Sequence, residues 1–258
     1  MIDFYYLPAS APCRAVMMLA RAIGVRLNLK SIDVLRGENM KPEYLKMNPQ
    51  HTIPTLNDNG FILWESRAIM IYLVSKYAKN DALYPKDPRK KGIVDQRLYF
   101  DIGTLYQNVF KAYFVVILGK ANKPREEDVQ ALEESFEVLS VFLQTSRFVA
   151  GDSITVADYS IITTVTTAEA FGFDIGRYDN VASWYQVCRR DMKKFGFDEI
   201  NITGARTLGV GYKANNGKGD EVEKERGNEE EQIKEEEQIK EIKEKDFKDT
   251  VIKKVKKD

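Results

Sequence analysis

The chain has 258 residues, of which 43% are hydrophobic, so it can bury the core of one large domain or two small ones. Lysine plus arginine and aspartate plus glutamate are equal at 39 each, which argues against a nucleic-acid-binding protein. Two separated cysteines and one histidine give no zinc-ligand set, and no apolar run reaches membrane-spanning length. We expect a cytoplasmic protein with no metal, no nucleic-acid partner and no membrane partner.

The first 80 residues alternate between strand and helix patterns. "IDFYYL" is predicted to be a buried strand, and the segment after Pro12 has apolar residues at helical spacing up to Gly24. "LNLKSIDV" is predicted to be a second strand, followed by a short helix at 41–48. "TIPTLND" and "GFILWE" form a predicted hairpin, and "SRAIMIYLVSKYA" is a predicted amphipathic helix. This order indicates an α/β domain over residues 1–80.

The second part of the chain is predicted to be entirely helical. A Pro-rich, charged stretch at 81–91 is typical of a linker, and the domain at 92–212 has only helical patterns, including a long one at 94–119. Within "GDSITVADYS", Thr155 and Asp158 have the spacing of a helix capping box.

Residues 213–258 form a charged, low-complexity tail in the sequence. Positions 220–258 contain 11 basic and 15 acidic residues, and "EEEQIK" at 229–234 is repeated at 235–240. The first 219 residues therefore have a net charge of +4 and the last 39 a net charge of −4. So little apolar surface cannot offset the entropy of ordering, and we predict a disordered tail.

Ser10 follows the first predicted strand, in "YLPASAPCR". A serine at the start of a helix is a good N-cap, with Pro12 in the first turn. The same hydroxyl could instead contact a reacting atom, assisted by the positive end of the helix. The local sequence leaves both interpretations open.

Several motifs, in this order and spacing, resemble those of cytosolic glutathione transferases, most strongly the insect delta class: "DFYYLPASAPCR", "KPEYLKMNPQHTIPTLNDNG", "LWESRAIMIYLVSKY", "QRLYFDIGTLYQ", "AGDSITVADYS" and "GFDEINITGA". The resemblance covers residues 1 to about 212. It implies a thioredoxin-like α/β N-terminal domain, an all-α C-terminal domain and a homodimer. It also implies an enzyme that conjugates glutathione, as co-substrate rather than cofactor, to a hydrophobic electrophile.

The resemblance also implies the site residues. Ser10 would stabilise the glutathione thiolate, and glutathione would be bound by six further residues: His51, Ile53, Pro54, Glu65, Ser66 and Arg67. Pro54 would be a cis-proline, and Asp101 would join a charge network with Arg67. The electrophile pocket would use residues of the first loop and the long helix: Leu7, Tyr106, Phe110, Tyr113, Phe114 and Ile117. The alternatives are purely structural roles: helix caps for the serines, a surface ion pair for the charged residues, and core positions for the aromatic residues.

Four further expectations follow, two from the resemblance and two on the function. Asn39 stands where many delta relatives have a second histidine. Asparagine can hydrogen-bond a carboxylate but brings no charge, so we expect weaker binding of the glycine end of glutathione. By the same resemblance, Met70 and Tyr99, with Arg67, would lie where the subunits of the homodimer meet. A carrier or peroxidase with little conjugating activity is the second functional reading. A redox enzyme that uses Cys13 is a third, disfavoured because Ser10 replaces the first thiol of a thioredoxin-type motif.

Overall fold

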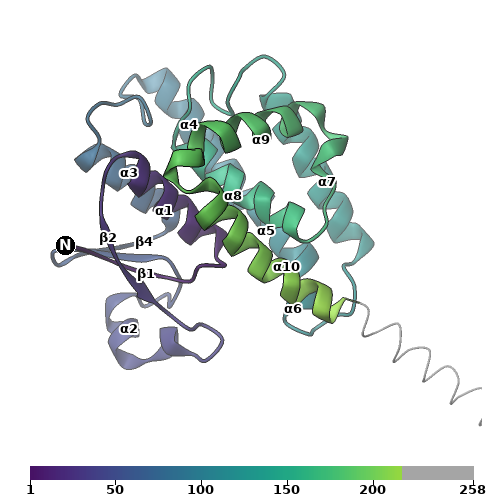
Figure 1. Cartoon of the computed structure of the whole chain (residues 1–258), viewed down its shortest axis with the longest axis horizontal. Helices are drawn as coiled ribbons and strands as arrows, with labels where there is room; N and C mark the ends of the chain where they lie inside the picture. The colour runs from purple at the N-terminus through teal and green to yellow at the C-terminus, as the bar shows by residue number, and fades with distance from the viewer. Residues whose placement is uncertain (217–258) are drawn as a thin grey trace, which may run out of the picture.

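The computed structural model describes residues 1–216 and has two packed parts (Figure 1). The N-terminal part contains four strands and three α-helices, in the order β1 (Ile2–Tyr6), α1 (Ala11–Ala22), β2 (Leu27–Ser31), η1 (Glu38–Met40), α2 (Pro42–Met47), β3 (Thr55–Asp58), β4 (Phe61–Trp64) and α3 (Ser66–Tyr77). The C-terminal part is helical as far as residue 215. The fold is therefore a thioredoxin-like α/β domain followed by an all-α domain, as predicted.

The helical part begins with one long, irregular helix. Its segments are α4 (Pro88–Phe100), η2 (Asp101–Leu105), α5 (Tyr106–Val109), η3 (Phe110–Phe114) and α6 (Val115–Ile117), with η2 and η3 in π-helical geometry. The rest comprises α7 (Glu126–Phe142), α8 (Val156–Ala170), η4 (Ile175–Arg177), α9 (Asp179–Met192), η5 (Lys193–Phe195), η6 (Phe197–Ile202) and α10 (Thr203–Asn215). None of the helices in residues 1–216 is long and apolar enough to cross a membrane.

The four strands form one sheet in the order β2-β1-β3-β4. β1 runs parallel to β2 and antiparallel to β3, with Phe4 opposite Leu56, and β3 runs antiparallel to β4. The side chains of Phe4 and Leu56 are fully buried. In Figure 1, α2 lies on the opposite side of the sheet from α1 and α3.

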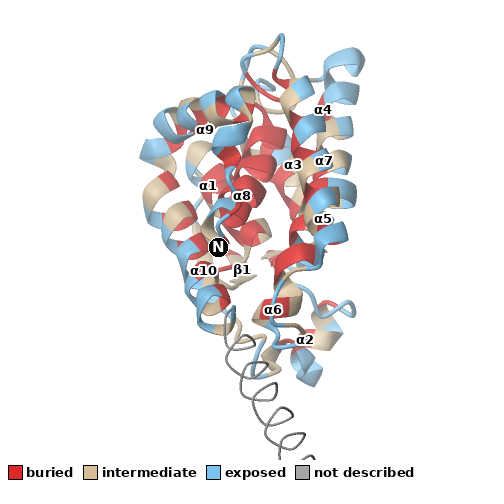
Figure 2. Ribbon diagram, turned by 90° about the vertical axis from the view of Figure 1, so that its right-hand side faces the viewer, coloured by how far each residue is buried: buried red, intermediate tan, exposed pale blue. Residues whose placement is uncertain are grey.

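Helix α1 connects the two parts, because it packs against α3 on one side and α8 on the other. Ser10 is its N-cap, and Gly24, at φ +75°, lets the chain turn away after the last helical residue. In Figure 2 buried residues gather at the centre of the molecule, around α1 and α8. The two parts therefore share one continuous hydrophobic core.

The predicted capping box of α8 is confirmed. Asp158 Oδ2 accepts hydrogen bonds from Thr155 N (2.8 Å) and Thr155 Oγ1 (3.1 Å), and Oδ1 accepts from Trp184 Nε1 (3.0 Å). Burial raises the pKa of Asp158, although these hydrogen bonds oppose the effect. The box starts a helix in which 13 residues are buried.

Two predicted boundaries are corrected. The long helix begins at Pro88 rather than at 94, because Asp87 accepts hydrogen bonds from Arg89 N (3.1 Å) and Lys90 N (2.9 Å) and Pro88 suits the first helical turn. Helix α10 continues to Asn215, three residues into the segment predicted as tail. The rest of that prediction, for 217–258, lies outside the described residues.

Candidate active site

The sheet brings three of the predicted segments to one edge. Tyr5 near the end of β1 lies opposite Thr55 at the start of β3, and Thr55 lies opposite Trp64 at the end of β4. The chain that leaves β1 leads to Ser10, the chain that enters β3 contains Ile53 and Pro54, and the chain that leaves β4 leads to Glu65. The strand directions alone therefore collect residues that are far apart in sequence.

Ser10 lies at the N-terminus of α1, where backbone N–H groups and the helix dipole favour negative charge. Its Oγ accepts a long hydrogen bond of 3.4 Å from Cys13 N, and its own N–H donates to Leu7 O (3.0 Å). Ser10 is therefore a helix cap in this structure. Because its side chain is half-buried and the cap bond is long, the hydroxyl proton can also be donated to a ligand.

The peptide bond between Ile53 and Pro54 is cis, as predicted. Just before it, His51 is exposed and has a left-handed backbone at φ +49°. The His51 carbonyl accepts a hydrogen bond from Asn39 Nδ2 (2.8 Å), and Asn39 is 7% exposed with its Oδ1 unpartnered among the described residues. Asn39 therefore contacts the His51 backbone, a role that the sequence did not reveal.

Glu65 and Ser66 form the start of α3. Glu65 is exposed and has φ +69°, while Ser66 is buried and accepts a hydrogen bond from Arg67 Nη1 (3.1 Å). Within residues 1–216, only three non-glycine residues have positive φ, and two of them are His51 and Glu65. Such backbone conformations cost about 1–3 kcal/mol and concentrate at functional sites. Their positions therefore agree with a ligand site at this edge.

Arg67 pairs with Asp101 across the two parts of the molecule. Asp101 is fully buried at the start of the π-helical segment η2, and its Oδ2 lies 2.5 Å from Arg67 Nη2. Ser160 Oγ (2.5 Å) and Thr164 Oγ1 (2.9 Å) also donate to this carboxylate. The sequence analysis missed both hydroxyls, because Ser160 and Thr164 are only two of several hydroxyl side chains on this helix and nothing in the sequence distinguishes them.

The predicted pocket aromatics divide into two groups. Phe110 is 41% exposed and stacks on Phe114 with ring centroids 4.6 Å apart, so both rings can line a pocket. Tyr113 is buried instead, against Phe171 (5.0 Å) and Tyr212 (5.3 Å). Tyr113 thus belongs to the core between η3 and α10, which is the commoner position for such an aromatic.

The remaining pocket residues lie at the two ends of the region. Leu7 and Ile117 are both half-buried, and Ile117 O accepts a hydrogen bond from Asn215 Nδ2 (3.1 Å). The Tyr106 ring lies under the Arg67 guanidinium at 5.5 Å, which connects the aromatic wall to the charged network. Burial raises the pKa of Tyr106, so its hydroxyl stays protonated at neutral pH.

Two other expectations can be compared with the structure. Cys13 is fully buried, and burial raises the pKa of its thiol to about 11, which disfavours the redox reading because the thiolate is the reactive form. The prediction that Met70 lies at a partner surface was wrong. Met70 is fully buried in the core, because it shares the inner face of α3 with Ile69 and Leu73. Tyr99 is 75% exposed. The described residues contain no group of three or more potential metal ligands.

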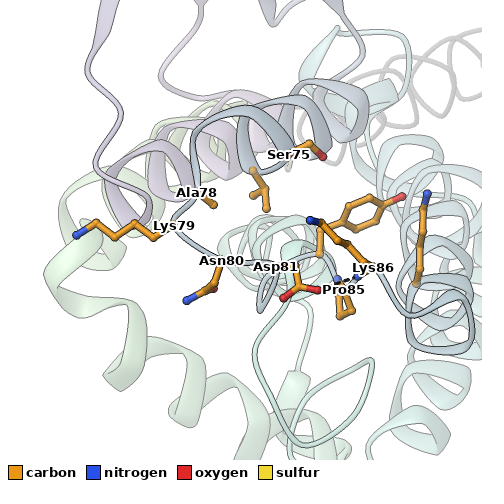
Figure 3. Close-up of a pocket in the computed structure, with 10 residues that line it drawn as sticks. Ser75, Ala78, Lys79, Asn80, Asp81, Pro85 and Lys86 are labelled. Atoms are coloured by element: carbon orange, nitrogen blue, oxygen red, sulfur yellow. Dashed lines mark hydrogen bonds between the residues drawn. The ribbon is translucent and has the colours of Figure 1, made fainter.

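A separate cavity of about 500 Å³ lies between the C-terminal end of α3 and the linker (Figure 3). Its lining includes Ser75, Asn80, Tyr84 and three lysines: Lys79, Lys86 and Lys91. The predicted glutathione residues are at the other end of α3, about 15 Å away by the rise of an α-helix. This cavity is therefore not part of the candidate site.

Comparison with known proteins identifies the class. The sequence matches the glutathione S-transferase N-terminal domain over residues 3–75 and the C-terminal domain over residues 105–191. The chain belongs to the glutathione S-transferase family and is a glutathione transferase.

Several similar solved structures are insect enzymes. Glutathione transferase BmGSTD1 of Bombyx mori is 48% identical, with a TM-score of 0.80 over 81% of this chain and 97% of that chain. A delta-class glutathione transferase of Nilaparvata lugens is 47% identical, with a TM-score of 0.79 over 83% and 99%. A glutathione transferase homologue of Drosophila mojavensis, solved with bound glutathione, is 32% identical, with a TM-score of 0.77 over 83% and 97%. The delta-class resemblance stated from the motifs is confirmed.

Proposed function

We propose that the chain conjugates glutathione to hydrophobic electrophiles, with the glutathione thiolate held by Ser10. The observation that carries this proposal is the meeting, at one edge of the sheet, of the N-terminus of α1, the cis-proline loop and the N-terminus of α3. That edge offers two helix N-termini to a ligand that carries negative charge at its thiolate and at its carboxylates.

The proposal assigns each end of the tripeptide. Ser66 and the first N–H groups of α3 bind the γ-glutamyl carboxylate, and the exposed Glu65 carboxylate binds the ammonium. The Ile53 N–H and C=O, which have no backbone hydrogen-bond partner among the described residues, pair with the cysteinyl backbone as an added strand would. The exposed His51 binds the glycine carboxylate. The glutathione bound in the Drosophila mojavensis homologue supports glutathione as the ligand by similarity.

The sulfur would then lie at Ser10. A hydroxyl that donates to sulfur favours the thiolate over the thiol, and the thiolate is the nucleophile. The electrophile would approach from the side of the exposed Phe110–Phe114 stack. Nothing in the described residues favours the carrier or peroxidase reading over conjugation.

The test is the ultraviolet absorbance of the bound thiolate against pH, in wild type and Ser10→Ala. Loss of a hydrogen bond to a charged group is worth about 1.5–3 kcal/mol, so the pKa of bound glutathione should rise by about 1–2 units. Asp87→Ala removes the N-cap of α4 and is the matched control, because it should lower stability without moving this pKa. If Ser10→Ala also lowers only stability, Ser10 is a cap and the proposal fails.

We further propose that the enzyme is a cytoplasmic homodimer. The similarity to insect glutathione transferases supports both points. Fluorescence microscopy of the tagged full chain tests the location, and sedimentation tests the assembly.

A further inference from the structure

Arg14, one turn after Ser10 on α1, is a fully buried cation. Its Nη1 donates to the Asn201 backbone O (2.7 Å) and to Asn201 Oδ1 (2.5 Å), and its Nη2 donates to Thr163 O (3.4 Å) and to Thr167 Oγ1. Nε has no partner among the described residues. Every acceptor is an uncharged oxygen, so the guanidinium is hydrogen-bonded without being neutralised.

The carboxylates on the elements around Arg14 are all engaged elsewhere. Their partners, in residues 1–216, are Arg67 for Asp101, Thr155 for Asp158, Tyr185 for Glu169, Arg189 for Asp198 and Arg21 for Glu199. After burial, which lowers the pKa of Arg14, the groups that influence this pKa are Cys13, Tyr106 and Tyr185, and none of them is a carboxylate. A buried charge without a counter-ion is strongly destabilising, so its presence needs an explanation.

Arg14 also lies where water is excluded. A Cβ added at Gly204, at the start of α10, would be 2.6 Å from Arg14 Cδ and 2.3 Å from Pro8 O, so α10 packs directly over both. Burial lowers the pKa of Arg14 to about 9, which still leaves the guanidinium charged at neutral pH. In such a dry setting its field is weakly screened.

That field reaches the groups next to Ser10. The backbone N–H of Arg14 donates to the backbone O of Ser10 (3.0 Å), so the two residues lie one helical turn apart. The charge of Arg14 acts to lower the pKa of two groups that burial raises, namely the Cys13 thiol and the Tyr106 hydroxyl. Cys13 N donates to Ser10 Oγ, the atom that we propose donates a hydrogen bond to the glutathione sulfur. Cys13 therefore lies next to the proposed position of that sulfur.

We propose that Arg14, held without a counter-ion between α1, α8 and η6, supplies positive potential that favours the thiolate of glutathione bound at Ser10. Arg14 does not touch the substrate. It acts through the charge of its guanidinium and is therefore a positioning residue, not a catalytic one. The inference rests on the proposed function, because it needs the sulfur to bind at Ser10. The missing counter-ion then has a reason: the guanidinium keeps its positive charge unpaired for a thiolate that binds at Ser10, one turn earlier on α1.

The sharpest test is Asn201→Asp, which neutralises Arg14 with almost no change of shape. Oδ1 keeps its hydrogen bond to Arg14, and the Thr166 hydroxyl, which now accepts from Asn201 Nδ2 (2.8 Å), can turn to donate instead. The variant should melt at a higher temperature than wild type, because the buried cation gains a partner. The pKa of bound glutathione should rise by about one unit, so conjugation at pH 6.5 should fall several-fold to about tenfold.

Thr167→Val is the matched control, because it removes one hydrogen bond to Arg14 and no charge. It should lower the melting temperature and leave the thiol pKa unchanged. Arg14→Gln is the second variant, which removes the cation itself and should raise the thiol pKa as Asn201→Asp does. If either charge-changing variant folds and binds glutathione with the wild-type thiol pKa, the inference is wrong. If Ser10→Ala fails to move that pKa, the proposed function fails instead.

Discussion

The Asp101 carboxylate lies 2.5 Å from the Arg67 guanidinium and accepts a hydrogen bond from each of two hydroxyls of α8. The Arg67 side chain is 11% exposed and that of Asp101 is fully buried. A pair this deep is costly to desolvate and is retained only when its geometry is well satisfied. Here it fixes the start of α3, where Ser66 is assigned to glutathione, relative to the helical part of the molecule.

Asp101→Asn should be strongly destabilising, because it leaves Arg67 as an uncompensated buried charge. Breaking one partner of a buried pair costs about 3–5 kcal/mol in unfolding free energy. The variant should also have a higher KM for glutathione, since Arg67 would no longer hold Ser66 in place. Glu127→Gln, which breaks the exposed Arg125–Glu127 pair, should cost less than about 1 kcal/mol in the same denaturant titration. Equal losses in the two variants would contradict the structural role of Asp101.

Asn39→Ala should weaken glutathione binding through His51. The Asn39 amide donates to the His51 carbonyl and so supports a left-handed backbone. Loss of one neutral hydrogen bond, about 1 kcal/mol, corresponds to a rise in KM for glutathione of about fivefold with little change in kcat. γ-Glutamylcysteine, which lacks the glycine carboxylate, should be used equally well by variant and wild type.

Asn180→Ala is the control for that variant, because Asn180 also donates to a backbone carbonyl, that of Ser140, but lies on α9. Asn180→Ala should leave the KM for glutathione and the KM for γ-glutamylcysteine unchanged. An Asn39→Ala enzyme that loses affinity for the dipeptide as much as for glutathione would show that Asn39 acts on another part of the site.

The sequence predicted those parts of the fold that depend on local chemistry. Gly24 at the end of α1 and the Thr155–Asp158 box each involve residues within a few positions of one another, and each is found in the structure. The cis-proline at Pro54 is also found, but it was predicted from the resemblance to the family. The start of the long helix at Pro88 was missed, because charge and prolines masked a good N-cap at Asp87.

Contacts between distant segments could not be predicted in the same way. Arg14 and Asn201 are 187 positions apart, and no sequence motif around either residue indicates that they are in contact. Met70 appeared to be a surface residue because polar residues precede it, whereas the packing of α3 on the core decides its burial. The predicted site residues came from the resemblance to a family, and the sheet directions then explained why those segments meet.

Asp58 should make stability depend on acid pH. It accepts hydrogen bonds from Tyr72 Oη (2.6 Å), Lys76 Nζ (2.6 Å) and Tyr77 Oη (2.5 Å). Burial alone would raise its pKa, but these three donors together hold the pKa well below its usual range. Because the folded pKa is depressed, the ionised carboxylate stabilises the fold above the unfolded pKa of about 3.9, and this contribution is lost as the pH falls below that value.

Asp58→Asn should therefore lower the unfolding free energy by about 2–3 kcal/mol at pH 7, and the difference from wild type should shrink as the pH is lowered toward 3. Denaturant titrations at a fixed protein concentration across this range measure it. Asp33→Asn, at an exposed pair with Arg36, should change stability by less than about 1 kcal/mol at pH 7. A gap between wild type and Asp58→Asn that stays constant with pH would mean that the carboxylate charge is not what stabilises the cluster.

Tyr99 is the residue on which we expect the proposed homodimer to depend most visibly. It is 75% exposed on α4, although tyrosine is a residue that interfaces favour because it buries a large ring and keeps a polar tip. Tyr99→Asp should weaken association by at least about 2 kcal/mol, which is about 30-fold, so that sedimentation at micromolar concentration shifts toward monomer. Val141→Asp changes a 56% exposed residue on α7 and should leave the sedimentation coefficient as in wild type. The wild-type chain sedimenting as a monomer would end the dimer proposal, whereas a dimer that tolerates Tyr99→Asp would place the interface elsewhere on the molecule.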